Sequence, residues 1–383
     1  MIDLNQFKFE QGPIRPPSEA YSLLIRVTRN CPWNRCLFCG IYKNTKFELR
    51  PAEDVIEDVK KAKAISDEIR ALSGQPGQDS FREAAASIYN QLQYDWSVRN
   101  VAMWLWAGAK SVFLQDANSL IMRTPELVRV LNFLRETFPQ VERITSYARS
   151  NTAAKKTLDE LIAIKNAGLT RLHIGFESGS DTVLEFIQKG VTAAQHIQGG
   201  VKVRQAGIEL SEYFIPGLGG RKWSEENAVE SAETLNKIDP DFIRIRSMML
   251  SPNHPLWAKI QSGEYEPQND DEIVEELGKF VARLELNSYL VSDHITNLLP
   301  EVEGKFPEAK SACLEIINRY LTLPDNERNN YKLGRRMGIY NSLDDIRNPA
   351  VRSQVDNALF TIEQDKTKDL DDILNRLKIG IAI

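Results

Sequence analysis

A regular alternation of strand-like and helix-like segments over residues 110–250 is the feature that most restricts the fold of this 383-residue chain. Short apolar segments such as SVFLQD (111–116), RITSYA (143–148), RLHIGF (171–176) and FIRIRSMML (242–250) are typical of strands. Helix-length segments with apolar residues three and four positions apart, such as SEENAVESAETLNKI (224–238), alternate with them. Strands that alternate with amphipathic helices form a parallel sheet. With a further strand expected within 21–30, the sequence predicts six β/α units in an α/β fold.

The segments on either side of this alternation follow other patterns. Residues 66–109 combine a turn-forming stretch, SGQPGQ (73–78), with helical periodicity, so we expect a helical insertion there. After residue 250 the sequence predicts a loop, helices over 271–285 and 307–321, and an extra strand within 287–293. The charged tail after residue 324 is expected to contain one or two helices.

Charge and hydropathy exclude some classes of protein. The net charge of −5 disfavours a nucleic-acid partner, because binding to phosphates needs clustered Lys and Arg. No apolar stretch approaches the roughly 20 residues of a membrane span. The N-terminus, MIDLNQFKFEQG, lacks the basic start and apolar run of a signal peptide. A cytoplasmic protein without a membrane partner is expected.

Three of the four cysteines, Cys31, Cys36 and Cys39, lie within nine residues with the spacing C-x4-C-x2-C. Cytoplasmic cysteines clustered this tightly usually bind a metal or carry out redox chemistry. Thiolates suit zinc and iron–sulfur clusters, but a structural zinc site needs a fourth ligand, and no histidine is near in sequence. A three-cysteine [4Fe–4S] cluster leaves one iron open to a small chelating molecule.

The loop TRNCPWNRCLFCGIY resembles the cluster motif of the radical S-adenosylmethionine (SAM) superfamily, including an aromatic residue, Phe38, before the last cysteine. The commonest spacing in that family is C-x3-C-x2-C, one residue shorter than here. The resemblance extends over roughly 21–250 and is strongest to the coproporphyrinogen dehydrogenase and Elongator-type oxidoreductase branch. It implies a partial (β/α)6 TIM-like barrel over 1–250, with the insertion at about 66–109, and a C-terminal strand and helical extension over 251–383.

The resemblance also implies an activity. A radical SAM oxidoreductase, lyase or transferase cleaves SAM reductively at its [4Fe–4S] cluster, and the 5′-deoxyadenosyl radical abstracts hydrogen from a substrate, here an unidentified small organic molecule. An electron donor such as flavodoxin or ferredoxin is then required. The alternative is a non-catalytic iron–sulfur protein for electron transfer or redox sensing, with Cys313 as a distant fourth ligand. A zinc-stabilised binding module is a third reading.

In a β/α barrel the reactive groups lie at the C-terminal ends of the strands. By resemblance, the expected SAM-binding residues at these ends and nearby are Phe38, Gln115, Asp116, Ser150, Glu177, Arg204 and Gly217. Three of them have alternative roles. Glu177 is also placed to cap the following helix, Arg204 to lie exposed on its helix, and Gly217 to form a tight turn.

Four further residues remain open in the sequence. Arg244 and Arg246 alternate along a strand and share one face, which suggests an anionic substrate if that face is the barrel interior. His294 is placed equally well for a substrate site and for a structural hydrogen bond. Cys313 has helical surroundings and is expected to be a buried structural cysteine.

Overall fold

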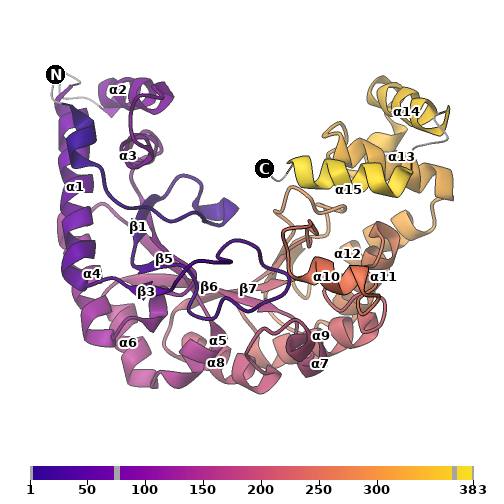
Figure 1. Ribbon diagram of the computed structural model, residues 1–383, viewed down its shortest axis with the longest axis horizontal. Helices are drawn as coiled ribbons and strands as arrows, with labels where there is room; N and C mark the ends of the chain where they lie inside the picture. The colour runs from indigo at the N-terminus through magenta and orange to yellow at the C-terminus, as the bar shows by residue number, and fades with distance from the viewer. Residues whose placement is uncertain (1–2, 73–77, 365–368, 382–383) are drawn as a thin grey trace. The chain divides into compact units, whose positions relative to one another are not determined.

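The computed structural model describes residues 3–72, 78–364 and 369–381 (Figure 1). These residues fall into two compact units. The first unit contains the chain up to residue 34, 42–175 and 198–210, and the second contains 35–41, 176–197 and 211 onwards. Residues 73–77 of the predicted turn lie outside the described ranges.

Four parallel strands form the sheet of the first unit, in the order β1, β4, β5, β6. They are β1 (Leu23–Arg26), β4 (Ser111–Gln115), β5 (Arg143–Ala148) and β6 (Leu169–Glu177), whose last two residues belong to the second unit. A separate antiparallel pair follows β1 and consists of β2 (Thr28–Arg29) and β3 (Glu48–Leu49). Successive residues of β4, among them Val112, Phe113 and Leu114, are all fully buried, as is typical of parallel strands enclosed on both faces.

The helices associated with this sheet are α1 (Ala52–Ala71), α2 (Gln78–Asn90), α3 (Trp96–Trp106), α4 (Thr124–Thr137), α5 (Ser150–Lys155), α6 (Leu158–Asn166) and α8 (Ala193–Gln205). Three 3₁₀ turns accompany them, at Leu4–Phe7, Pro17–Glu19 and Ser119–Ile121. The predicted insertion is helical, but its predicted start at 66 lies inside α1, which continues to Ala71. Pro51 is the N-cap residue of α1, a position where proline costs no helical N–H partner.

In the second unit the strand order is β7, β8, β9, β10. The strands β7 (Glu209–Phe214), β8 (Phe242–Ile245) and β9 (Tyr289–Val291) are parallel, and β10 (Gly304–Lys305) pairs antiparallel with β9. The predicted strand over 242–250 therefore ends five residues early, at Ile245. The predicted extra strand within 287–293 is present as β9.

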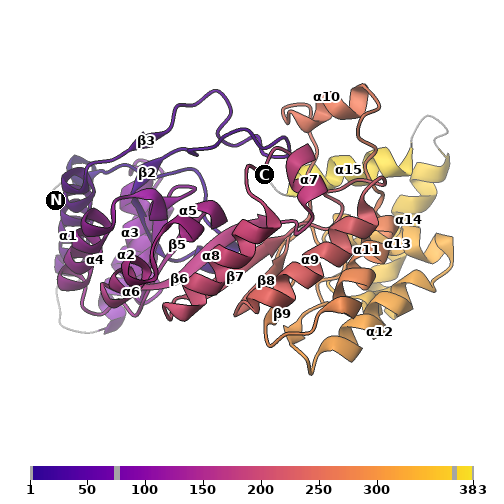
Figure 2. The same cartoon turned by 90° about the horizontal axis from the view of Figure 1, so that it is seen from below.

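The helices of the second unit are α7 (Asp181–Phe186), α9 (Ser224–Ile238), α10 (Leu256–Gln261), α11 (Asp270–Arg283), α12 (Lys310–Leu321), α13 (Asp325–Arg336), α14 (Pro349–Gln364) and α15 (Leu370–Ile381), with a 3₁₀ turn at Leu343–Arg347. Helices α9 and α11 lie side by side (Figure 2). After residue 324 the described chain forms three α-helices rather than the one or two predicted.

A mostly buried carboxylate, that of Asp270, ties the C-terminal helices to α11. Asp270, at the first position of α11, accepts a hydrogen bond of 2.8 Å from Arg336 of α13 and lies 3.6 Å from Lys378 of α15. Burial opposes its ionisation, but these two cations lower the pKa of Asp270 to about 2. The carboxylate of Asp270 is therefore ionised at neutral pH, and it anchors two helices that are distant in sequence, α13 and α15.

The fold is α/β with a mostly parallel central sheet, which confirms the predicted class and is consistent with a partial TIM-like barrel. Among the described residues, no helix combines the length and the apolar character required to span a bilayer.

Candidate functional site

The cysteine loop begins in the first unit, directly after β2. Asn30 adopts a left-handed backbone with φ of 66°, a conformation that asparagine tolerates better than most residues. The thiol sulfur of Cys31 accepts a hydrogen bond of 3.5 Å from the backbone N–H of Asn34. The guanidinium of Arg149, just after β5, lies 5.5 Å from the ring centre of Trp33. The segment 31–34 is thus a tight turn held on an aromatic–cation contact.

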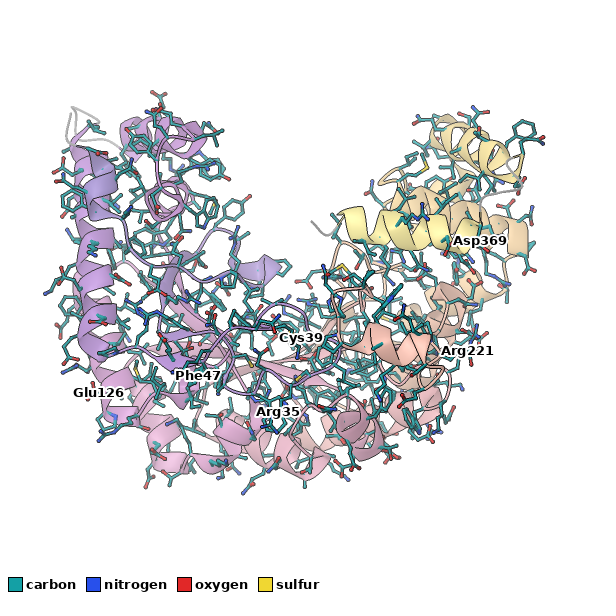
Figure 3. All side chains as sticks on the ribbon, viewed as in Figure 1. Arg35, Cys39, Phe47, Glu126, Arg221 and Asp369 are labelled. Carbon is teal, nitrogen blue, oxygen red and sulfur yellow. The ribbon has the colours of Figure 1, made fainter. Side chains whose placement is uncertain are left out.

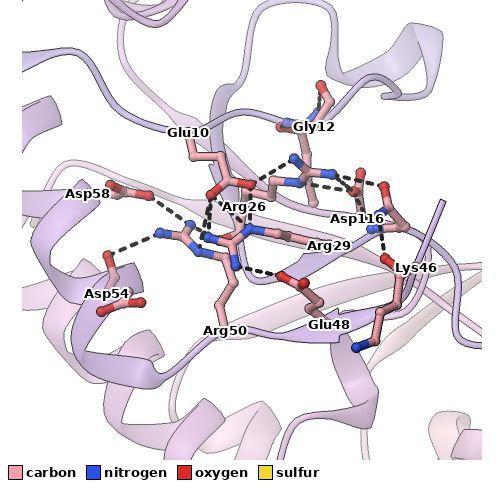
Figure 4. Close-up of polar contacts among 12 residues, drawn as sticks. Glu10, Gly12, Arg26, Arg29, Lys46, Glu48, Arg50, Asp54, Asp58 and Asp116 are labelled. Atoms are coloured by element: carbon pink, nitrogen blue, oxygen red, sulfur yellow. Dashed lines mark hydrogen bonds and ion pairs between the residues drawn. The ribbon is translucent and has the colours of Figure 1, made fainter.

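A fully buried carboxylate, that of Asp116, holds both ends of the segment that carries the cysteines (Figure 4). Its Oδ2 accepts hydrogen bonds from Arg26 at 2.6 and 3.0 Å and from the backbone N–H of Asn30 at 3.0 Å. Its Oδ1 accepts a hydrogen bond of 3.0 Å from the hydroxyl of Tyr42. Asn30 precedes Cys31 and Tyr42 follows Cys39. Asp116 is therefore a positioning residue for the loop, and direct contact with SAM stays a prediction.

A network of alternating charges surrounds this carboxylate (Figure 4). Glu10 forms ion pairs with Arg26 at 2.8 Å, with Arg29 at 2.7 Å and with Arg50 at 3.7 Å. The hydrogen bond from Arg29 is the main cause that lowers the pKa of Glu10. Arg50 is buried and pairs with Asp58 of α1 at 2.7 Å. The N-terminal segment, β1 and α1 are joined by charge-assisted hydrogen bonds.

Gln115, the neighbour of Asp116, holds the N-terminal segment. Its side-chain amide donates to the carbonyl groups of Gly12 and Ile14 at 3.0 and 2.8 Å, and its oxygen accepts from the N–H of Gly12 at 2.8 Å. A Cβ atom on Gly12 would lie 2.3 Å from Oδ1 of Asp116, so the close approach requires glycine. The side-chain amide of Gln115 therefore binds the backbone of the N-terminal segment, and its contact with SAM stays a prediction.

Two other predicted SAM residues have different surroundings. Ser150 is buried at the first position of α5, next to Arg149. The N–H of Arg149 donates a hydrogen bond of 3.1 Å to the side chain of Asn118. Arg204 is exposed on α8, as its alternative reading expected. Arg149 is buried at the end of β5, a position that marks it as a candidate in the sequence, although it was not among the expected SAM-binding residues.

Residues 35–41 of the cysteine loop belong to the second unit. Arg35 and Cys39 of this segment are labelled in Figure 3. The N–H of Cys39 donates to the carbonyl of Cys36 at 3.4 Å, which closes a turn between the two thiols. Leu37, between them, donates to the carbonyl of Ile187 and accepts from the N–H of Leu256, both at 2.9 Å. Cys36 is buried and Cys39 is partly buried. The loop is therefore fixed by its backbone on both sides.

Glu177, at the end of β6, forms an ion pair of 2.8 Å with Lys189, and both side chains are mostly buried. The ammonium group of Lys189 also lies 5.6 Å from the ring centre of Phe38. Glu177 does not cap α7, because the N-cap position of that helix is Ser180. Its backbone is left-handed, with φ of 65°, and such conformations in non-glycine residues are concentrated at functional sites. Glu177 and Phe38, two of the predicted SAM-binding residues, thus both lie next to Lys189 in the second unit.

Gly217, the first glycine of PGLGG, has φ of 83°, which glycine adopts without strain. Its N–H donates to the buried carboxylate of Glu276 at 2.8 Å, and its carbonyl accepts from the hydroxyl of Tyr265 at 2.9 Å. The predicted tight turn is present. Contact of this turn with SAM stays a prediction.

Glu212 of β7 lies on the same strand face as Phe214, two residues on, since side chains alternate along a strand. Phe214 stacks on Phe280 of α11, with ring centres 4.1 Å apart, so this is the helix-covered face. Glu212 is fully buried, and in the described part of the chain neither carboxylate oxygen has a hydrogen-bond partner. Burial, and secondarily the charge of Glu177, raise the pKa of Glu212 well above its ordinary value.

We expect Glu212→Met to raise the free energy of unfolding by about 1–3 kcal/mol, because a buried polar group without a partner is costly. Because the pKa of Glu212 is higher in the folded than in the unfolded protein, its contribution to the stability of the fold is greatest below the ordinary pKa of 4.5. That contribution is lost as the pH rises from there through the folded-state pKa. The gain from Glu212→Met should therefore grow with pH above 4.5. Urea unfolding at pH 5 and pH 8 measures it. Glu233→Met, at an exposed position of α9, should change little, and equal effects of both variants would contradict this account.

The cysteines provide the donor set for a metal cluster. All four are free, and three of them lie in the loop. No three His, Cys, Asp or Glu side chains within 3–72, 78–364 and 369–381 lie close enough to hold one ion, so the ligand assignment rests on the motif. Cys313 is fully buried on α12, as predicted, and burial raises its pKa to about 11. A protonated thiol is a poor ligand, which disfavours Cys313 as the fourth.

Comparison with known proteins extends these observations. The chain is 20% identical over 227 residues to a tRNA uridine(34) acetyltransferase of Methanocaldococcus infernus, covering 52% of this chain and 42% of the relative. It is 23% identical over 223 residues to a CDK5RAP1-like protein of Caenorhabditis elegans, covering 57% and 38%. The chain thus spans less than half the length of these curated relatives.

Solved structures also show distant similarity. Coproporphyrinogen III oxidase (HemN) from Escherichia coli aligns with a TM-score of 0.42 and 15% identity, over 64% of this chain and 48% of the other. The archaeal Elp3 of Methanocaldococcus infernus aligns with a TM-score of 0.39 and 15% identity, over 49% and 48%. Scores this low carry no argument about activity.

The decisive finding is a match of residues 25–232 to the model of the radical SAM superfamily. The matched range is more than half of the chain. It runs from β1 to α9 and includes the three cysteines of the loop. The chain is a member of the radical SAM superfamily.

Proposed function

We propose that this protein cleaves SAM reductively at a [4Fe–4S] cluster and uses the resulting 5′-deoxyadenosyl radical to abstract hydrogen from a small organic substrate. Enzymes of the superfamily use a [4Fe–4S] cluster and SAM. The observation that carries the proposal is the C-x4-C-x2-C loop after β2, inside the matched range. The thiolates of Cys31, Cys36 and Cys39 would hold the cluster, since soft sulfur ligands suit iron–sulfur sites.

The remaining site residues position the loop or bind SAM. Asp116 fastens the two ends of the loop through Asn30 and Tyr42. Glu177, beside Lys189 at a strand end, offers a carboxylate to polar groups of SAM. Phe38, directly before the last cysteine, packs against the apolar clusters that contain Leu218 and Leu256, and its proposed role is to help exclude water from the cluster. Gln115, Ser150, Arg204 and Gly217 remain proposed contacts on the basis of the family resemblance.

The partners are also proposals. A flavodoxin or ferredoxin is the proposed electron donor, because SAM cleavage consumes one electron. A small molecule is the proposed substrate, in keeping with the net charge of −5. One relative is named as a tRNA acetyltransferase, so the expected exclusion of nucleic acid stays a prediction.

Anaerobic reconstitution with iron and sulfide, followed by dithionite and SAM, tests the proposed function. We expect a brown protein that forms 5′-deoxyadenosine and methionine, both measured by chromatography. A fully reconstituted brown protein that neither binds nor cleaves SAM would instead identify an electron carrier. A colourless protein that retains zinc would identify a zinc-stabilised module.

A further inference from the structure

Two arginines meet a single carboxylate on one face of the sheet in the second unit. Arg244 of β8 donates to Oδ2 of Asp293, just after β9, and Arg246 donates to Oδ1 at 2.6 Å. Arg244 also donates to the hydroxyl of Ser211 at 3.2 Å. Arg246 lies 4.5 Å from the ring centre of Tyr213. All five residues belong to the same unit.

The strand register shows which face this is. Tyr213 of β7 is paired with Arg244 of β8, so the two side chains share a face. Phe214, the next residue, points to the opposite face and stacks on Phe280 of α11. The arginines therefore lie on the face away from α11. The sequence analysis expected an anionic substrate if Arg244 and Arg246 faced the barrel interior, and the face away from the helices is the one that this expectation requires.

Asp293 is shared between two cations. Its carboxylate faces two guanidinium groups that are mostly buried, with exposed side-chain fractions of 7% for Arg244 and 13% for Arg246. Tyr213 adds no negative charge, because burial raises the pKa of its hydroxyl. Two guanidinium groups around one carboxylate create a positive environment, which favours a further anion.

The imidazole of His294, next to Asp293 in the sequence, lies in the same positive environment. Burial, and then the positive charge of Arg246, lower the pKa of His294 to about 4, while Asp293 opposes them. Lys378 and Arg336 act in the same direction as Arg246. His294 is therefore neutral at pH 7, and its Nδ1 shares a hydrogen bond of 2.7 Å with the hydroxyl of Thr296.

Cations also outnumber carboxylates when the ion pairs of Asp270 and Asp293 are taken together. Asp270 pairs with Arg336 and Lys378, and Asp293 pairs with Arg244 and Arg246. Within the described residues, three arginines and Lys378, whose pKa is lowered by burial, thus pair with two carboxylates.

We propose that Arg244 and Arg246 form a subsite for an oxyanion of the substrate, a carboxylate or a phosphate group, and that Asp293 is their internal counter-ion in its absence. Arginine forks bind both anions in bidentate fashion. Asp293 is 27% exposed and is the most accessible member of the group, so an incoming anion displaces it. The strand ends that carry Arg246 and Asp293 are where ligands bind in parallel α/β sheets. This inference rests on the proposed function for its link to a reacting substrate.

The test is a ligand-observed NMR titration of the reconstituted holoprotein with SAM, with propionate and inorganic phosphate as probes. We expect saturable binding of at least one probe to the wild type. Arg246→Gln should weaken it about tenfold or more, because a charge-assisted hydrogen bond is lost. Asp293→Asn should strengthen it, because the competing carboxylate is removed. The preferred probe distinguishes a carboxylate substrate from a phosphorylated one.

Controls separate a lost subsite from a lost fold. Arg246→Lys keeps the charge and should retain part of the binding, and circular dichroism checks the fold of each variant. Arg319→Gln removes an arginine of α12 that pairs with Asp344 at the surface and should leave binding unchanged. The inference is wrong if neither probe binds the wild type, if Arg246→Gln binds equally well, or if Asp293→Asn weakens binding.

The same wild-type preparations are assayed for 5′-deoxyadenosine. Formation of 5′-deoxyadenosine without probe binding overturns the subsite alone. Probe binding that depends on Arg246, in a protein that does not cleave SAM, overturns the proposed function and leaves an anion site.

Discussion

Cys36→Ala is expected to abolish the formation of 5′-deoxyadenosine and to remove most of the iron bound after reconstitution. Cys36 is the most buried of the three loop cysteines, with 7% of its surface exposed. Its backbone carbonyl accepts the hydrogen bond from Cys39 that closes the turn. Alanine preserves that turn but leaves two thiolates for a cluster that needs three protein ligands. Iron content, visible absorbance and chromatography of the products measure the loss.

Cys313→Ala is the matched control, since Cys313 is the other buried cysteine of the same unit. Its thiol donates only a long sulfur hydrogen bond of 3.6 Å to the carbonyl of Glu303. We expect normal iron content and normal SAM cleavage in this variant. Loss of the iron site in Cys313→Ala would favour a four-ligand electron carrier. Full activity in Cys36→Ala would remove the basis of the cluster assignment.

Asp116→Asn is expected to lower the free energy of unfolding by about 3–5 kcal/mol, the usual cost of removing one partner from a buried ion pair. The amide oxygen can accept only from the donors on one side, and the negative charge that pairs with Arg26 is lost. Asn30 and Tyr42 lose their common anchor. We therefore expect a lower iron content in addition to the lower stability.

Glu48→Gln provides the control for this substitution. It also removes a carboxylate charge from the network, but the side chain of Glu48 is 49% exposed and its one ion pair among the described residues is with Arg29 at 2.9 Å. Exposed ion pairs contribute about 0–1 kcal/mol. Urea unfolding of the apoprotein and iron analysis of the holoprotein compare the two variants. Equal stability and equal iron in Asp116→Asn and the wild type would show that this carboxylate does not hold the loop.

Local sequence patterns were sufficient to predict most of the strands and helices of the α/β region and the superfamily. The strand over 143–148 was predicted to the residue, and the helix at 224–238 likewise. Both are encoded by the spacing of apolar residues within one segment. The cysteine motif is equally local, because all three thiols lie in nine residues. The tail was less well predicted, since α13 has few apolar residues and is held by ion pairs such as Arg336–Asp270.

The roles of individual side chains depended on contacts that no local pattern contains. Asp116 stood at a predicted strand end, but its partners Arg26 and Tyr42 are 90 and 74 residues away. Only the parallel pairing of β1 with β4 brings Arg26 to it.

By itself, the sequence determined the α/β class and the superfamily and led to the proposal of the three thiolates as cluster ligands, because each follows from residues close together in the chain. The tertiary structure alone decided that Asp116 holds the loop, that Glu212 turns to the helices and that Arg244 and Arg246 share Asp293. Hydrogen bonds and ion pairs act over a few ångströms, and only the folded chain brings their distant partners within that range.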